Sequence, residues 1–141
     1  MQISSRFTMT IHMFLCIEYF SKDYKVTSDF MAGSIGTNPV IIRNILKQLK
    51  DAELVEVARG TGGVKVLRPY DEITFLDIYN AVECVPNETL FSFHKNPNKN
   101  CPIGKNIHNL IDDELEKVQK AMEIELKKIT LYDIVKKLKK I

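Results

Sequence analysis

The 141-residue chain contains little cysteine, glycine or proline, and neither sign of charge is in large excess. Three cysteines are too few, and odd in number, for the disulfide framework that stabilises many small secreted domains. Six glycines and five prolines are too few for a fibrous or linker-rich protein. A formal net charge of +2 does not by itself indicate a nucleic-acid binder. These scarcities favour an ordinary globular protein in a reducing, cytoplasmic location.

Long hydrophobic runs are also missing. No stretch approaches the roughly 18 consecutive apolar residues that suggest a membrane span. Arg6, His12 and Glu18 interrupt the apolar N-terminal segment, and no small-residue cleavage site follows it. We therefore expect no targeting signal and no membrane partner. The 45% of hydrophobic residues is enough for one core, so we expect either one domain or one small domain with an appended element.

The spacing of the apolar residues predicts a mainly α-helical chain. The predicted helices cover about residues 4–20, 28–35, 39–52 and 74–83, a long amphipathic helix of about 25 residues ending near Ile129, and a last helix from Thr130 through the terminal lysines. Ser4 and Ser5 are suitable N-caps for the first helix. Thr74 and Thr130 each precede an aspartate by three residues, which is a capping-box pattern. Because capping alone demands this pattern, we interpret the two similar helix starts as two caps and not as a duplication.

A glycine-rich hairpin is predicted between the third and fourth helices. Segments 54–57 and 64–67 are rich in β-formers and flank the loop 59–63, whose glycines permit a tight turn. The predicted elements follow the order of a winged helix-turn-helix: a helix, a short helix, a glycine turn, a capped helix and a hairpin. Residues 37–68 contain six Lys or Arg and three Asp or Glu, a local charge of +3, which supports DNA binding weakly.

Five segments carry a resemblance to a known family: residues 1–7, 38–49, 54–55, 59–63 and 73–83. The most specific is the wing Arg59-Gly-Thr-Gly-Gly63, which is followed about ten residues later by Glu-Ile-Thr and Asp-Ile. Together they strongly resemble the Rrf2 family of bacterial transcriptional regulators, over nearly the whole chain. The resemblance implies a homodimeric winged helix-turn-helix protein that binds double-stranded operator DNA, usually as a repressor, with its long helix crossing over the partner.

The resemblance also implies a division of the chain and a set of DNA contacts. Residues 1–83 would form the DNA-binding domain, 84–102 a loop with a candidate sensor cysteine, and 103–141 the dimerisation helix and C-terminal helix. By position, Asn38, Val40 and Arg43 face the bases, where arginine suits a guanine edge, and Arg59 takes the role of the wing arginine in the minor groove. The candidate phosphate contacts are Ser5, Lys47, Thr61 and Lys65. For the two lysines, a solvated surface position is an equal alternative.

Many members of that family hold an iron–sulfur cluster with three cysteines before the long helix, and this sequence departs from that pattern. Its loop region has only Cys84 and Cys101, and Gly104 stands where a helper histidine would follow. Because such clusters need several thiolate or imidazole ligands, we expect no conventional cluster and no cofactor. A mixed site made by Cys101, His94 and residues of the other subunit stays open as an alternative.

Cys101 is the better candidate for chemistry. It lies in a polar loop near Lys99 and Lys105 and close to a predicted helix N-terminus, and both features favour the thiolate. We interpret Cys101 as a redox or electrophile switch, with a purely structural packing role as the alternative. Cys16 and His12 have ligand spacing on one apolar helix, but a core position is the preferred interpretation.

Two other functions compete with DNA-binding regulation. An enzyme needs a nucleophile with a base in reach. Cys101 with His94 or His108 is the only candidate pair, and no known catalytic motif surrounds these residues. The loop 59–63 is not a phosphate-binding P-loop, because no Gly-Lys-Ser/Thr follows it. We therefore expect no enzyme. The second alternative is an effector-gated protein-binding adaptor that does not read DNA in the apo state.

Overall fold

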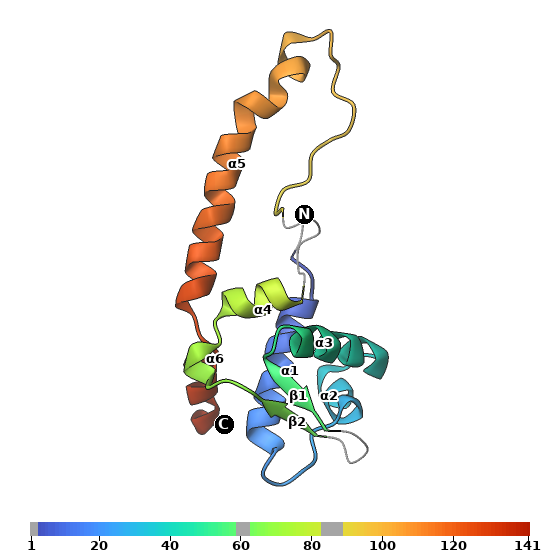
Figure 1. Ribbon diagram of the computed structural model, residues 1–141, viewed down its shortest axis with the longest axis vertical. Helices are drawn as coiled ribbons and strands as arrows, with labels where there is room; N and C mark the ends of the chain where they lie inside the picture. The colour runs from blue at the N-terminus through green and yellow to red at the C-terminus, as the bar shows by residue number, and fades with distance from the viewer. Residues whose placement is uncertain (1–2, 59–62, 83–88) are drawn as a thin grey trace.

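The computed structural model describes residues 3–58, 63–82 and 89–141 (Figure 1). Its elements, in chain order, are the helices α1 (Arg6–Phe20), α2 (Ser28–Ile35) and α3 (Pro39–Asp51), the strands β1 (Val55–Val57) and β2 (Val64–Val66), the 3-10 helix η1 (Tyr70–Glu72), the helices α4 (Phe75–Ala81), α5 (Pro102–Lys128) and α6 (Leu131–Val135), and the 3-10 helix η3 (Lys136–Lys140). The described residues therefore form a mainly helical protein with one small β-hairpin, and the predicted fold class is confirmed.

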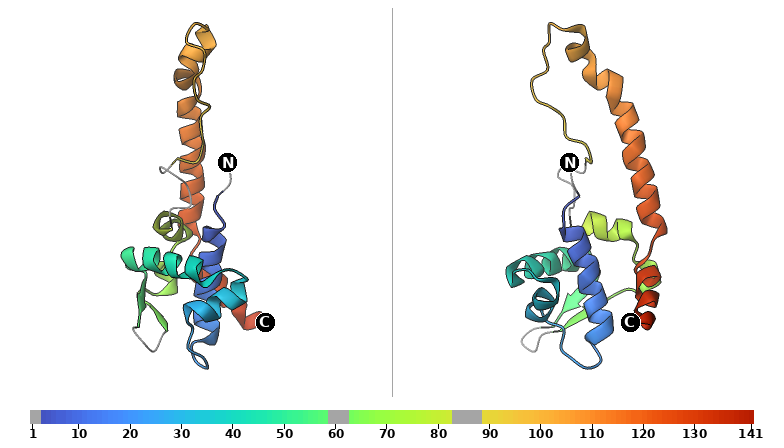
Figure 2. Two further views of the ribbon diagram at one scale, coloured as in Figure 1. Left: turned by 90° about the vertical axis from the view of Figure 1, so that its right-hand side faces the viewer. Right: turned by 180° about the vertical axis from the view of Figure 1, so that it is seen from behind.

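Helix α1 lies at the centre of the core, with α2, α3 and the hairpin on one side and α6 on the other (Figures 1 and 2). Its buried residues include Met13, Phe14 and Ile17. Helix α3 packs its predicted stripe into this core: Ile42, Ile45, Leu46 and Leu49. Each fully buried side chain of this size contributes roughly 1.5–3 kcal/mol relative to exposure. This burial fixes which face of α3 is left for a partner.

Of the two predicted caps of α1, Ser4 and not Ser5 makes a side-chain hydrogen bond to the helix start. Ser5 occupies the N-cap position, but its side chain makes no capping hydrogen bond. Instead the Ser4 hydroxyl accepts a hydrogen bond from the Arg6 amide at 3.2 Å. The Arg6 guanidinium donates to the Gln48 side-chain oxygen, and this bond joins the beginning of α1 to α3.

The hairpin is antiparallel, with Val55 opposite Val66, Glu56 opposite Lys65, and Val57 opposite Val64. Side chains alternate between the two faces of a strand, so the valines share one face and the charged pair occupies the other. Each strand has three residues, one fewer than predicted. The predicted tip residues 59–62 lie outside the described residues.

Helix α5 extends away from the rest of the molecule, and the segment 89–101 runs beside it to its far end (Figures 1 and 2). The helix has 27 residues and begins at Pro102, five positions before Ile107, where the apolar repeat starts. None of its residues is buried. The Leu90 amide donates to the Gln119 side chain at 2.9 Å, and the Phe93 ring meets the His108 ring edge-on at 4.8 Å. No helix among the described residues is long and apolar enough to cross a membrane.

The two predicted capping boxes, at Thr74 and Thr130, are both present and lie against each other. In each box the threonine hydroxyl accepts from the aspartate amide, and the aspartate carboxylate accepts from the threonine amide. Thr74 and Thr130 also form an isolated antiparallel bridge, in which Phe75 N–H donates to Ile129 O at 2.8 Å and Leu131 N–H donates to Ile73 O at 2.9 Å. The chain after α5 is thereby attached to the start of α4.

The last predicted helix is shorter than expected. Regular α-helix α6 ends at Val135, and the lysine-rich segment that follows is the 3-10 helix η3. Leu131, at the start of α6, is fully buried in the core. The following residues are largely exposed, so tertiary packing supports only the first turn.

Candidate nucleic-acid interface

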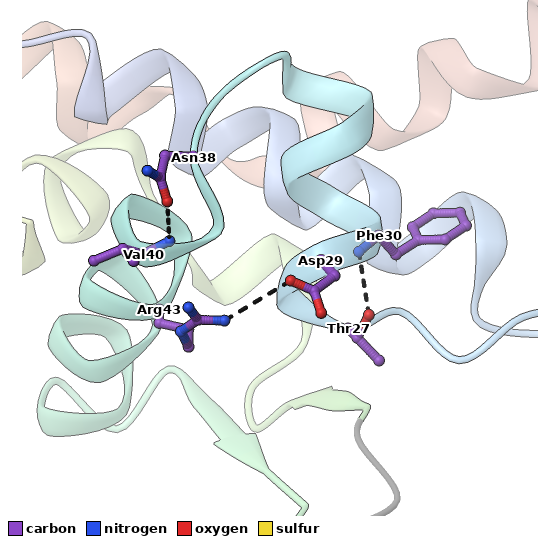
Figure 3. Close-up of polar contacts among 6 residues, drawn as sticks. All are labelled: Thr27, Asp29, Phe30, Asn38, Val40 and Arg43. Atoms are coloured by element: carbon purple, nitrogen blue, oxygen red, sulfur yellow. Dashed lines mark hydrogen bonds and ion pairs between the residues drawn. The ribbon is translucent and has the colours of Figure 1, made fainter.

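A tight turn positions α3 relative to α2. The Thr27 hydroxyl caps α2 by accepting from the Phe30 amide at 3.1 Å. Gly36 ends α2 with a φ of 80°, which is the left-handed conformation that glycine adopts without strain. Asn38 then caps α3, since its side-chain oxygen accepts from the Val40 amide at 2.8 Å, and Pro39 follows in the first turn. The carboxamide oxygen of Asn38 is thus already used in holding the helix (Figure 3).

The outward face of α3, with its N-cap, carries four of the eight residues that the sequence analysis predicts as DNA contacts. Val40 is 51% exposed although it is apolar, and Arg43 and Lys47 are exposed on the same face. This face lies opposite the buried stripe, as the helical periodicity predicts. The structure thus brings Asn38, Val40, Arg43 and Lys47 together on one surface.

A groove of about 330 Å³ lies between α3, the start of α2 and the hairpin. Its lining residues are Thr27, Ser28, Arg43, Leu46, Lys47, Lys50, Val57, Gly63 and Val64. Three lining side chains of α3 are cationic. The lining residues Leu46, Val57 and Val64 are apolar. No described lining residue is acidic. The lining of the groove therefore combines cationic side chains of α3 with apolar side chains of α3 and the hairpin.

Arg43 does not point freely into solvent. Its Nη1 atom lies 3.8 Å from Oδ1 of Asp29, in the first turn of α2 (Figure 3). The pair joins the two helices of the helix-turn-helix. Sequence reasoning missed Asp29 because nothing in a linear pattern shows which α2 side chain meets α3.

The other predicted contacts are more dispersed. Ser5 is exposed at the start of α1. Lys65 is exposed on β2 but occupies the hairpin face that also carries Glu56, its cross-strand neighbour, so part of its charge is offset. Arg59 and Thr61 lie outside the described residues. Lys50 lines the groove and was not among the predicted contacts, although its place one turn after Lys47 is a readable signal.

Cys101 occupies the N-cap position of α5 and is partly exposed. Hydrogen bonds from the backbone amides of Gly104 and Ile103 lower the pKa of its thiol. This lowered pKa favours the thiolate, and the backbone amides at the start of α5 are its main cause. Cys84 lies outside the described residues.

Cys16 and His12, which have ligand spacing on α1, differ in burial. Cys16 is buried in the core, only 4% exposed, as interpreted from the sequence. His12 is exposed instead, and its Nε2 lies 2.9 Å from the Ser34 hydroxyl, to which the Cys16 thiol also donates at 3.4 Å. The core interpretation is thus wrong for His12, which meets the exposed Ser34 of α2 at the surface.

Comparison with known proteins identifies the family. Residues 3–137 match the family model described as "Rrf2: Iron-dependent Transcriptional regulator". The chain belongs to the Rrf2 family. It is 38% identical over 133 residues to YwnA of Bacillus subtilis (strain 168), classed as an HTH-type transcriptional regulator, with 94% of this chain and 96% of that protein covered. Rrf2 membership makes the protein a transcriptional regulator and not an enzyme.

Solved structures of similar proteins share the whole winged-helix fold. A crystal structure of a protein classed as DNA-binding is 34% identical, with a TM-score of 0.70, over 92% of this chain and 98% of that one. A regulator structure from Lactobacillus plantarum has a TM-score of 0.77 at 23% identity, over 96% and 90% of the two chains. T. potens IscR has a TM-score of 0.67 at 22% identity, over 98% and 88%. The last two likenesses show the fold alone.

Among the residues that the structure describes, the available donors do not match the iron dependence named in the family description. The described residues contain no group of three or more His, Cys, Asp or Glu side chains placed to hold a metal ion. At Gly104, where family members would have a helper histidine, an added Cβ would lie 2.4 Å from the Asn98 carbonyl oxygen. The turn over the start of α5 thus has no room for a side chain at that position.

Proposed function

We propose that this Rrf2 protein is a homodimeric, sequence-specific DNA-binding repressor whose activity responds to the redox state of Cys101. The observation that carries the proposal is the exposed face of α3 beside the cation-lined groove. A helix about 10–12 Å wide fits the DNA major groove. Val40 and Arg43 would then meet base edges, while Lys47 and Lys50 would lie near phosphates.

Several features of the charge distribution support DNA as the partner. Arg43 suits a guanine edge, where a bidentate contact discriminates against a wrong base by roughly 1–3 kcal/mol. The neighbouring lysines would contact phosphates and position α3 without reading sequence. Ser5, Thr61 and Lys65 remain candidate phosphate contacts, and Arg59 the candidate minor-groove residue.

Helix α5 supports a homodimer. Ile103, Leu110, Val118 and Ile124 are each between 53% and 62% exposed on a helix without a single buried residue. Apolar side chains in such number along one extended helix favour burial against a second surface. A second α5 supplies a surface of the same length and character, and a two-fold dimer matches a symmetric operator.

Cys101 supports redox control. Its thiolate would attack hydrogen peroxide, forming an S–O bond as the O–O bond breaks. The products would be a sulfenic acid and a hydroxide ion, which takes a proton from solvent to become water. The lowered thiol pKa increases the thiolate fraction near neutral pH. Cys101 lies where segment 89–101 joins α5, so this chemistry occurs on the helix that we assign to the dimer.

Selection from genomic DNA tests the proposal. The reduced protein is incubated with genomic fragments at near-physiological salt, and the retained fragments are sequenced. We expect a two-fold-symmetric motif, less transcription from promoters that contain it, and loss of binding after peroxide treatment in the wild type but not in Cys101→Ser. No enriched motif would overturn DNA reading and favour the adaptor. Peroxide sensitivity of Cys101→Ser would overturn the switch alone.

A further inference from the structure

The ion pair between Asp29 and Arg43 joins α2 to α3, two helices separated by a turn. The other ion pairs between described residues lie within α5 or link α6 to η3. The Asp29 and Arg43 side chains are 78% and 55% exposed. A pair so exposed to water contributes little to folding. The main effect of the pair is therefore on the direction in which the Arg43 guanidinium points.

The surroundings of the pair are cationic. Arg43, Lys47 and Lys50 follow one another at intervals of four and three residues, so they share one face of α3 and line the groove. Asp29 follows Ser28, another lining residue, and brings a carboxylate to the edge of this basic surface. It lies in the first turn of α2, where the amide ends of the helix favour a negative charge.

An arginine beside DNA has two kinds of target. Phosphates are numerous and carry no sequence information, whereas a guanine edge offers two acceptors in one plane. Arginine has five N–H donors, so a single contact from Asp29 to Nη1 leaves donors for a bidentate bond. The same carboxylate repels the DNA backbone, and it therefore disfavours phosphate positions on its own side.

We infer that Asp29 is a positioning residue for specificity, which restrains Arg43 from nearby phosphates and directs it toward a base edge. The inference rests on the proposed DNA-binding function. Without the carboxylate, Arg43 would bind phosphates of any sequence. Affinity for random DNA would rise, and discrimination in favour of the operator would fall.

The test compares Asp29→Asn with the wild-type protein on the selected operator and on a random duplex of equal length, over a range of salt concentrations. For the variant we expect tighter binding to the random duplex by about threefold. The salt slope on that duplex should steepen by up to about 0.9, the value for one added phosphate contact. The ratio of operator affinity to random affinity should fall by at least about fivefold.

Two controls separate positioning from simple charge. Asp71→Asn makes the same charge change on η1, which packs against α6, and should leave the ratio unchanged. In an Arg43→Gln background, Asp29→Asn should no longer change the ratio, because the residue through which it acts is gone.

Each contrary result has a distinct meaning. A ratio that still falls in the Arg43→Gln background would overturn the inference, since Asp29 would then act on DNA directly. A wild-type protein that selects an operator, with an unchanged ratio in Asp29→Asn, would overturn it while leaving the proposed function intact. A wild-type protein that selects no DNA would overturn the proposed function, and with it the role of Asp29.

Discussion

Cys101 shows how one residue acquires chemistry from the backbone around it. Amides of Ile103 and Gly104 stabilise the thiolate, so the folded protein holds its thiol pKa below the ordinary value. We expect alkylation of Cys101 to become fast at a lower pH in the native protein than in urea. The measurement is the alkylation rate of the Cys101 peptide against pH, read by mass spectrometry. Coincident native and unfolded profiles would contradict the assignment.

Gly104 provides a second test at the residue scale. A Cβ at this position would collide with the backbone of Asn98, so Gly104→Ala must displace the turn that precedes α5. We expect the pKa of Cys101 to move toward its ordinary value as the amide contacts are lost. Gly33→Ala is the matched control, because nothing lies within 4 Å of a Cβ built there. An unchanged alkylation profile in Gly104→Ala would show that the turn does not set the thiol pKa.

At the scale of elements, the two capping boxes begin α4 and α6 and bring their first residues into one bridge. We expect Thr130→Ala to lower the free energy of unfolding by about 1 kcal/mol, because the Asp133 amide loses its acceptor. Urea denaturation followed by circular dichroism measures the change. Thr8→Ala is the control, since its hydroxyl donates only to a carbonyl on the exposed side of α1. Equal stabilities for the two variants would contradict a stabilising cap.

Asp133 makes the same element sensitive to acid. Its pKa is lowered mainly by the hydrogen bond from the Thr130 backbone amide. A carboxyl group with a lowered folded-state pKa stabilises the protein fully above its unfolded pKa, and this contribution disappears as pH falls through the folded-state value. Asp133→Asn should therefore reduce the loss of stability on acidification below the ordinary aspartate pKa. Parallel denaturation curves at several acidic pH values would show this, and identical pH dependence would refute it.

Local sequence patterns, such as apolar spacing and capping residues, predicted these helices well. Contacts between elements were harder to predict from the sequence. The stripe of Ile42, Ile45 and Leu49 shows directly in the helical spacing of α3. The pairing of Thr74 with Thr130 does not, because residues far apart in the sequence meet only after the chain folds. The start of α5 at Pro102 lies one residue before the predicted bound at 103, but the closure of the Asn98 backbone over its first turn was not visible in the sequence. Asp29 was missed because its role depends on how α2 crosses α3.

At the scale of the whole molecule, the proposed homodimer depends on α5, whose apolar side chains are exposed along its length. We expect Val118→Glu to weaken the dimer by placing a charge in the apolar surface of α5. Sedimentation velocity would show a monomer, and affinity for a two-fold operator would fall at least tenfold while the helix content stays unchanged. Asp113→Lys, an exposed change on the same helix, is the control. A dimer that persists in Val118→Glu would place the subunit contact elsewhere.

The bridge between Thr74 and Thr130 attaches the C-terminal end of α5 to the start of α4. The helix can therefore tilt as a rigid rod about this point. A helix of 27 residues is about 40 Å long, so a tilt of about 5° at the bridge moves its far end by about 3.5 Å. Cys101 lies at that far end. One oxygen atom added to the Cys101 sulfur would displace neighbouring side chains by a few ångströms. A shift of that size at this end of α5 corresponds to a small rotation at the Thr74–Thr130 bridge. Within the proposed dimer, such a rotation would change the spacing of the two α3 helices, and with it the fit to a two-fold operator.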